Sequence, residues 1–242
     1  MKKTKLISLA FFALIGCVAA SCSKDDDEAL KFKDVTIPAG STLDMSEGKN
    51  LTWTSTNDYI ATISDGTIDA KRVGDVTMKS SQGSFKVEVT PKYNYYTEPY
   101  INFGASKESV KQAMKDFTLV KETDNALAYE GTGYTTLIIY TFENEALETS
   151  GIVTGSAYSS LLANWTVERY IYVTTSDNYI GMISVDKKTA IVISPDIINK
   201  KAYYFVIYAS ASNDSTRGRS GITPSAIEQL VKEYSSTVDT VF

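Results

Sequence analysis

The pattern of apolar and polar residues differs from one region of the chain to the next, beginning with an export signal. Residues 6–15 form an apolar core of ten residues behind Lys2, Lys3 and Lys5. This core is too short to cross a bilayer of about 30 Å as a helix. A basic start followed by a short apolar core is typical of a cleaved signal peptide, which we place at residues 1–21.

Short runs of alternating apolar and polar residues, broken by turn signals, fill residues 30–92. In residues 85–89 the apolar side chains share one face of a strand. Residues 60–63 and 67–70 flank Asp65-Gly66, and Asp-Gly between two alternating runs is a strong signal of a β-hairpin. Several short strands with turns at close intervals predict a small all-β sandwich.

Helical and strand-like periods alternate in residues 94–212. A helix is expected over residues 106–117, with Ser106 as its N-cap. A second helix is expected over residues 156–168. Each helix is followed by four strand-like runs with turn residues between them, as in an antiparallel meander: residues 118–122, 127–130, 135–142 and 147–154 after the first, and 170–173, 179–185, 190–194 and 203–209 after the second.

The recurrence of one helix and four strands predicts a duplicated α-β4 unit, and thus an α+β domain over residues 94–212. Two such units side by side form one eight-stranded antiparallel sheet with both helices on the same face. The opposite face is then open, or partly open. A binding surface is expected there.

Tyrosine is abundant in the predicted strands, and the chain has 16 tyrosines in all. Tyrosine suits an exposed sheet face because it combines an apolar ring with a hydroxyl that contacts water, proteins and sugars. Alternatively, these rings pack against neighbours across the strands. The strand tyrosines are Tyr129, Tyr140, Tyr170, Tyr172, Tyr179, Tyr203, Tyr204 and Tyr208.

Residues 213–242 are expected to be a flexible tail that contains an amphipathic helix. Residues 210–220 are polar and include Arg217-Gly218-Arg219, a composition accessible to proteases. Pro224 then opens the helix. Its apolar stripe either docks on the domain, which we favour, or binds a partner; the stripe comprises Ala226, Ile227, Leu230, Val231 and Tyr234.

Two cysteines compete as the site at which the signal is processed. Leu14-Ile15-Gly16-Cys17 fits the lipobox of bacterial lipoproteins, and Ala19-Ala20-Ser21-Cys22 fits a looser version. We favour Cys22, because the acidic run at residues 24–28 follows it directly and resembles the signal that exports Bacteroidota lipoproteins to the outer face of the outer membrane. Acylated Cys22 would anchor the protein firmly, with residues 22–29 as an acidic tether. Alternatively, neither thiol is acylated and the signal is an ordinary one.

Charge and composition then exclude several classes of function. Cleavage before Cys22 removes three of 24 basic residues and none of 29 acidic ones, so the net charge moves from −5 to −8. An acidic chain argues against binding to nucleic acid. The sequence contains no histidine, and no cysteine follows Cys22. Histidine triads, histidine or thiolate metal sites and disulfides are therefore excluded, and we expect no enzyme, no catalytic residue, no metal and no cofactor.

Carboxylates are the remaining candidates for chemistry. Asp65, Asp69 and Asp75 do not have the spacing of a calcium loop. Glu143, Glu145 and Glu148 cluster at one turn, where a carboxylate pair for glycoside hydrolysis is conceivable but a charged hairpin tip is ordinary. We therefore assign no site to either cluster.

Five short motifs in residues 51–91 follow the pattern of one family: Trp53-Thr54-Ser55-Thr56-Asn57, Ile60-Ala61-Thr62-Ile63-Ser64, Gly66-Thr67-Ile68, Val73-Gly74-Asp75-Val76-Thr77 and Val87-Glu88-Val89. The segment resembles a bacterial immunoglobulin-like domain of group 2 (BIG2). Ala70-Lys71-Arg72 departs from the family, which more often has small apolar residues there. The resemblance implies a spacer or adhesion module without catalytic residues. Trp53 is then a core residue rather than a platform for a sugar.

The sequence as a whole favours a lipid-anchored protein of the outer membrane, exposed on the cell surface. The segment that begins at Phe103-Gly104-Ala105-Ser106 resembles the C-terminal regions of other tethered surface lipoproteins. We expect the BIG2-like domain to be a stalk and the α+β domain to bind a glycan or protein ligand, plausibly in adhesion. The alternatives are a carbohydrate-active accessory protein or carboxylate-dependent glycosidase, and a structural component of the envelope.

Overall fold

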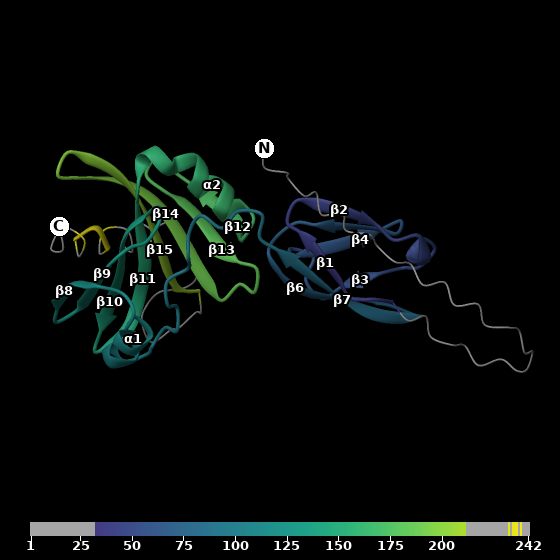
Figure 1. Ribbon diagram of the computed structural model, residues 1–242, viewed down its shortest axis with the longest axis horizontal. Coiled ribbons are helices and arrows are strands. Elements are labelled where there is room, and N and C mark those ends of the chain that lie inside the picture. Colours follow the sequence, from purple (N-terminus) through teal and green to yellow (C-terminus); the bar gives the residue numbers. More distant parts are fainter. Residues whose placement is uncertain (1–31, 212–231, 233, 237, 239–242) are drawn as a thin grey trace, which may run out of the picture.

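The computed structural model describes residues 32–211, 232, 234–236 and 238. Figure 1 shows two domains side by side along the long axis of the molecule. Most of the described structure is β-sheet. Within these ranges, none of the helices combines the length and the apolar character that crossing a bilayer requires. The expected signal peptide, the tether with Cys22 and most of the tail lie outside the described residues.

The first domain is all-β, as predicted, and consists of two sheets. One sheet has the order β1-β7-β6-β3 and the other β2-β5-β4. Ile68, Met78 and Val87 are fully buried in its core. The elements are β1 (Val35–Pro38), β2 (Ser41–Asp44), η1 (Ser46–Gly48), β3 (Thr54–Ser55), β4 (Ala61–Ser64), β5 (Thr67–Ala70), β6 (Gly74–Ser80) and β7 (Gly83–Thr90).

The Asp65-Gly66 turn joins β4 to β5, as the hairpin signal predicts. Both residues have positive φ angles, 49° at Asp65 and 76° at Gly66, which is the conformation of a type I′ hairpin turn. A Cβ atom at Gly66 would lie 2.8 Å from the carbonyl oxygen of Met45. The position therefore requires glycine for two reasons, its backbone conformation and its close neighbours.

Trp53 packs inside the first domain. Its ring meets Phe32 and Phe85 edge-on, with centroids 4.9 and 5.2 Å away. The indole Nε1 donates a hydrogen bond to the carbonyl oxygen of Gly48 at 3.0 Å. These contacts support the role of a core residue, because a sugar platform needs an open ring face.

The second domain is built on one eight-stranded sheet with the order β12-β13-β14-β15-β11-β10-β9-β8. All neighbouring strands in it are antiparallel, and β11 meets β15 at the centre. The first half comprises α1 (Lys107–Ala113), β8 (Leu119–Thr123), β9 (Ala126–Glu130), β10 (Thr135–Glu143) and β11 (Ala146–Gly155). The second comprises η2 (Ser156–Tyr158), α2 (Ser159–Val167), β12 (Tyr170–Thr175), β13 (Ile180–Ser184), β14 (Thr189–Ile198) and β15 (Lys201–Ser210).

Both helices pack on the same face of this sheet, together with the segment that precedes α1. Val110 of α1 and Trp165 of α2 are fully buried in one apolar cluster. Tyr96 is 6% exposed in the same cluster. The segment that connects the domains is therefore part of the second domain, because its aromatic side chains complete the core there.

The opposite face of the sheet is not simply open. Tyr234 and Val238 are helical, almost fully buried and packed in a cluster with Phe205 and Ile207. Tyr234 is the one member of the predicted apolar stripe that the structure describes. Its burial favours docking of this segment on the sheet over a free helix that binds a partner.

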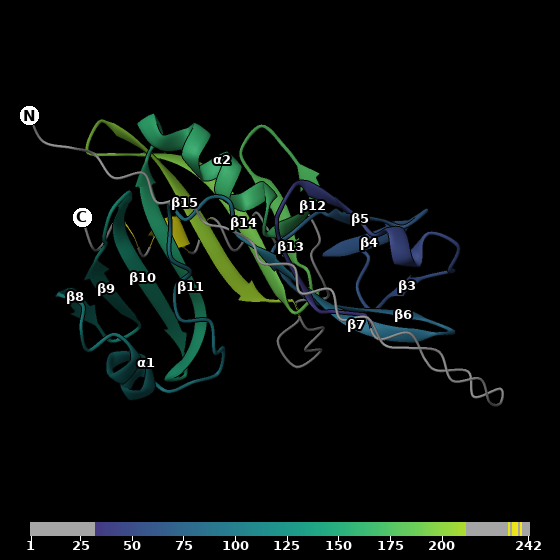
Figure 2. The same cartoon turned by 45° about the vertical axis from the view of Figure 1, so that its right-hand side comes forward.

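The two domains contact each other at the β12–β13 end of the large sheet, which both Figure 1 and Figure 2 place next to the first domain. Arg72 donates a hydrogen bond from Nε to the carbonyl oxygen of Tyr170 at 2.9 Å. Asn57 donates from Nδ2 to the carbonyl oxygen of Val185 at 3.0 Å. Arg72, one of the residues that depart from the motif pattern, thus makes a contact between the domains. Its partial burial at this contact lowers its pKa.

Candidate ligand-binding pocket

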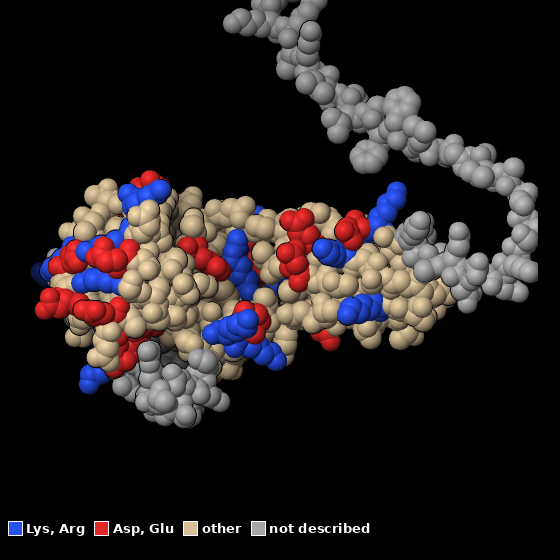
Figure 3. All heavy atoms as spheres, turned by 90° about the horizontal axis from the view of Figure 1, so that it is seen from below, with Lys and Arg blue, Asp and Glu red and all other residues tan. Residues whose placement is uncertain are grey.

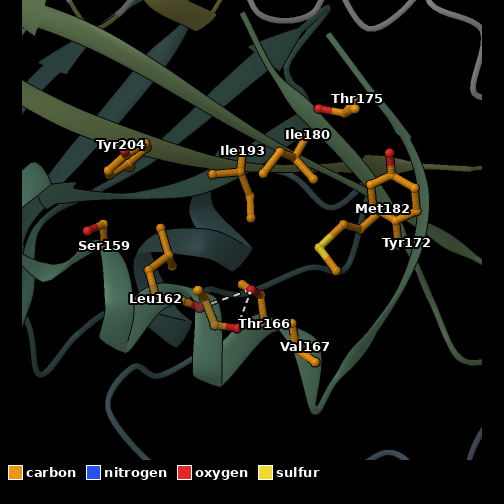
Figure 4. A pocket seen from close by; sticks show the side chains of 11 residues that line it. Ser159, Leu162, Thr166, Val167, Tyr172, Thr175, Ile180, Met182, Ile193 and Tyr204 are labelled. Carbon is orange, nitrogen blue, oxygen red and sulfur yellow. Dashed lines mark hydrogen bonds between the residues drawn. The ribbon is translucent and has the colours of Figure 1, made fainter. Parts of the chain in front are cut away.

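A pocket of about 410 Å³ lies between α2 and the half of the sheet formed by β12–β15 (Figure 4). Ligand pockets of proteins typically measure about 300–1,000 Å³ and have mostly apolar walls. The size and position of this pocket make it the leading candidate for a binding site in the described part of the chain.

The helix α2 supplies one wall. Residues spaced three or four apart lie on the same face of a helix, and this face carries Ser159, Leu162, Ala163 and Thr166. Trp165 lies at the edge of this face, outside the pocket, and its ring packs on Tyr96 with centroids 5.5 Å apart. One helix therefore closes the pocket on one side and packs on the segment between the domains on the other.

The strands supply the opposite wall. Alternate residues of a strand point to the same face, and Ile180 and Met182 of β13 both line the pocket. Ile193 of β14 pairs with Ile180 in the sheet and lies beside it. Met182 and Ile193 are only 5% and 7% exposed, so they form the deep part of the pocket. Figure 4 shows both side chains pointing toward α2.

The rim of the pocket is apolar and accessible. Val167 is 64% exposed, Tyr172 is 56% exposed and Ile180 is 40% exposed, and all three line the pocket. A group of accessible apolar side chains at the mouth of a pocket is typical of a binding surface rather than of a closed core.

Five hydroxyl groups line the pocket, but two of them already have partners in the protein. Thr166 donates to the carbonyl oxygen of Leu162 at 2.9 Å, and Thr175 donates to that of Tyr179 at 3.2 Å. The hydroxyls of the other three make no hydrogen bond to a described residue: Ser159, Tyr172 and Tyr204. Among the described residues of the lining, none is Asp, Glu, Lys or Arg.

Most of the strand tyrosines are buried, so the structure supports the alternative in which these rings pack against neighbours across the strands. Tyr179 lies on the face opposite the helices. Four other strand tyrosines lie under the helices: Tyr129, Tyr140, Tyr170 and Tyr208. Tyr203 and Tyr204 are half-buried, and Tyr172 is the exposed exception. Only Tyr172 and Tyr204 line the pocket. The buried rings pack against neighbours because the two helices lie on one face of the sheet, and Tyr234 and Val238 pack on the other.

Burial explains the acid–base behaviour of these tyrosines. Loss of solvent raises the pKa of Tyr140, Tyr170 and Tyr208 above the ordinary value. The hydroxyl of Tyr170 donates to the carboxylate of Glu98, and it lies 3.2 Å from the hydroxyl of Tyr208. Tyr140, Tyr170 and Tyr208 are therefore neutral side chains of a packed core.

The acidic clusters singled out in the sequence are surface turns and strands. Glu143 and Glu145 are exposed around the β10–β11 turn, and Asp65, Asp69 and Asp75 are exposed in the first domain. Within the described ranges, no group of three acidic residues is placed to hold a metal ion. None of these carboxylates lines the pocket.

An exposed group of aromatic side chains lies outside the strands, where the strand pattern does not predict it. Tyr134 and Tyr158 are 38% and 42% exposed, with ring centroids 5.0 Å apart. Tyr95 meets Tyr134 edge-on at 6.0 Å and stacks on Tyr93 at 5.6 Å. These rings come from the segment between the domains, a loop and η2, so the period of the strands does not indicate them.

Charge does not mark a separate site on the face seen in Figure 3. There the basic and acidic side chains lie interspersed in small groups of both signs. Such a face has no extended field of one sign that would attract a charged partner.

Sequence reasoning also missed the pocket, although α2 carried a signal. Its apolar residues are not confined to one stripe, because Leu162 and Trp165 are buried in the core whereas Val167 is 64% exposed and also lines the pocket. An apolar residue outside the core stripe, such as the exposed Val167, indicates a second apolar surface.

Comparison with known proteins adds no relative. No protein-family model matches the chain, and no curated protein matches it significantly. The likeness of residues 51–91 to BIG2 domains therefore rests on the motifs alone.

Proposed function

We propose that this protein is a lipid-anchored binding protein of the bacterial outer membrane, exposed on the cell surface. Acylated Cys22 is the anchor, a BIG2-like stalk follows, and the second domain binds the ligand. The observation that carries the binding role is the pocket of about 410 Å³ beneath α2, with its accessible apolar rim.

The proposed domain types have support in the topology. The first domain is a sandwich of four and three strands, the arrangement expected of an immunoglobulin-like domain. In the second domain each helix precedes four strands, and the last strands of the two halves, β11 and β15, lie side by side. Such an order supports a tandem α-β4 repeat that arose by duplication.

The contacts between the domains support the role of the first domain as a stalk. Backbone and side-chain hydrogen bonds join its loops to α2 and to the strands beside it, including Val73 N–H to the carbonyl oxygen of Glu168 at 2.7 Å. A stalk fixed in this way holds the pocket in a defined orientation relative to the first domain.

Membrane fractionation of cells tests the anchor. The wild-type protein and the control variant Cys17→Ala are expected in the membrane fraction, because neither lacks the proposed acylation site. Cys22→Ala is expected in the soluble fraction after export. If Cys22→Ala stays in the membrane and Cys17→Ala is released, the site is Cys17; if both stay, the proposed anchor is wrong.

Glycan binding is a second candidate function, and the exposed rings of Tyr134 and Tyr158 favour it. Tyrosine rings at a protein surface stack on the apolar faces of sugars. A glycan array probed with the wild type and with Tyr158→Ala tests this role. Signals that disappear in the variant support it, and the same signals in both proteins contradict it.

A further inference from the structure

We infer that the pocket beneath α2 binds the aliphatic chain of an uncharged amphiphile, such as a fatty alcohol or a monoacylglycerol. This inference rests on the proposed role of the pocket as the ligand site, and it specifies the chemical class of the ligand. Three features of the lining carry it: its apolar depth, its lack of charge and the position of its free hydroxyls.

The deep part of the pocket selects an aliphatic ligand. Leu162, Met182 and Ile193 are each less than 8% exposed and offer only carbon and sulfur to the cavity. A polar group placed there would lose its hydrogen bonds to water without replacement, which is costly. Methionine adapts its shape easily, so Met182 allows the pocket to accept chains of different conformation.

The lack of charge selects an uncharged head group. Among the described residues of the lining there is no lysine or arginine to pair with a carboxylate or phosphate, and no aspartate or glutamate to pair with an ammonium group. Burial of an unpaired charge carries a large penalty. A fatty acid or a cationic amphiphile of the same chain length therefore finds no ion-pair partner in the lining, and its chain can enter only as far as the charge stays in water.

The free hydroxyls lie where a head group would be. Ser159 and Tyr172 are exposed, and Figure 4 shows them on opposite sides of the pocket. Both are free of hydrogen bonds to described residues, so they are available to a hydroxyl or ester group of the ligand. Because these hydroxyls lie on opposite sides, a small head group needs only one of them at a time, whereas the three are too few for the many hydroxyls of a sugar that is enclosed in the pocket.

Fluorescence binding with the processed chain, from Ser23 onward, tests the inference without detergent. The probe is N-phenyl-1-naphthylamine, an uncharged apolar dye, and the competitors are dodecanol, monolaurin, dodecanoate, dodecyltrimethylammonium and maltose. Dodecanol and monolaurin are expected to displace the dye at concentrations at least about tenfold lower than the two charged analogues. Maltose is expected to have no effect.

A pair of matched variants locates the site. Ala163→Phe places a ring in the pocket from α2, and Ala113→Phe places the same ring on α1, where the alanine is exposed and lies outside the pocket. Binding is expected to weaken at least about tenfold in the first variant and to stay unchanged in the second. Circular dichroism of both variants checks that they fold.

The results separate this inference from the proposed function. Equal displacement by charged and uncharged amphiphiles, or equal binding by the two variants, would overturn the inference. Displacement by maltose alone would also overturn it, while leaving the protein a surface binding protein. Protection of the protein inside intact cells would contradict the proposed surface location, even if the dye binds as expected.

Discussion

The carboxylate of Glu168 accepts a hydrogen bond from the backbone N–H of Tyr93 at 3.0 Å, which ties the end of α2 to the segment between the domains. The N–H of Lys92 donates to the same carboxylate at 2.9 Å. Glu168 is only 6% exposed and forms an ion pair with Arg169, whose guanidinium lies over the ring of Trp165. One buried carboxylate thus holds the segment between the domains against the second domain, beside the direct contacts that Arg72 and Asn57 make.

Replacement of that carboxylate should weaken the junction. Glu168→Ala leaves two backbone donors without their acceptor and removes the ion pair of Arg169, whose guanidinium keeps its hydrogen bond to the carbonyl oxygen of Trp165. We expect a loss of about 3 kcal/mol in the free energy of unfolding. Chemical denaturation measures this loss, and small-angle scattering should show a wider range of domain orientations.

The control for the junction is Glu108→Ala. The side chain of Glu108 is 81% exposed and pairs with Lys111, and such surface pairs contribute less than about 1 kcal/mol. Equal losses in the two variants would contradict the role assigned to Glu168.

Gly151 on the central strand β11 makes room for Tyr234. A Cβ atom there would lie 2.4 Å from the hydroxyl of Tyr234 and 2.7 Å from the carbonyl oxygen of Val206. Gly151→Ala should therefore cost about 1–3 kcal/mol or more through overpacking. Gly155→Ala, on the same strand, is the control, because its Cβ would be 3.8 Å from the nearest atom, in the ring of Tyr158. Thermal unfolding distinguishes them, and equal stability would show that Tyr234 does not dock there.

The hydroxyl of Tyr234 is buried and has no hydrogen-bond partner among the described residues. A buried polar group without a partner destabilises the fold by about 1–3 kcal/mol. Tyr234→Phe removes the hydroxyl and keeps the ring, so we expect a higher melting temperature than in the wild type. A lower melting temperature would show that this hydroxyl has a partner after all.

Buried tyrosines should make the protein sensitive to alkali. Loss of solvent raises the pKa of Tyr140, Tyr170, Tyr208 and Tyr234 in the folded state, so above a pH of about 10 the unfolded chain loses these protons first. Their contribution to stability is complete below the pKa of the unfolded state and falls as the pH rises, by about 1.4 kcal/mol per pH unit for each group.

Tyrosinate absorbance and circular dichroism measure this transition together. The four buried rings should ionise in the same cooperative step in which secondary structure is lost, and Tyr234→Phe should make the dependence on pH shallower. Ionisation of these tyrosines well before unfolding would contradict their burial.

Much of the fold follows from short-range patterns in the sequence. The alternation in residues 67–70 predicts β5 to the residue, and Ser106 caps α1 by accepting the N–H of Ser109 at 3.2 Å, as its position before an apolar period indicates. Local periodicity determines which residues form a strand or helix, and turn residues determine where it ends.

The pocket and the junction follow from contacts between distant segments, which local patterns do not contain. Ser159 and Tyr204 lie on the same pocket although 45 positions separate them. A strand tyrosine has the same pattern in the sequence whether or not a helix covers it, so the sequence leaves open whether Tyr208 is exposed, and the structure shows it fully buried. Likewise, Arg72 has the pattern of a solvated turn residue, and only the neighbouring domain explains it.

Protease accessibility on intact cells tests the central claim, a surface-exposed binding protein, most directly. Cells that express the wild type are treated with protease beside lysed cells and beside intact cells that express Cys22→Ala. We predict digestion of the wild-type protein on intact cells, with a periplasmic marker protein left whole, and release of Cys22→Ala from the membrane. Protection of the wild-type protein until the cells are lysed would contradict the claim and would place its ligand in the periplasm.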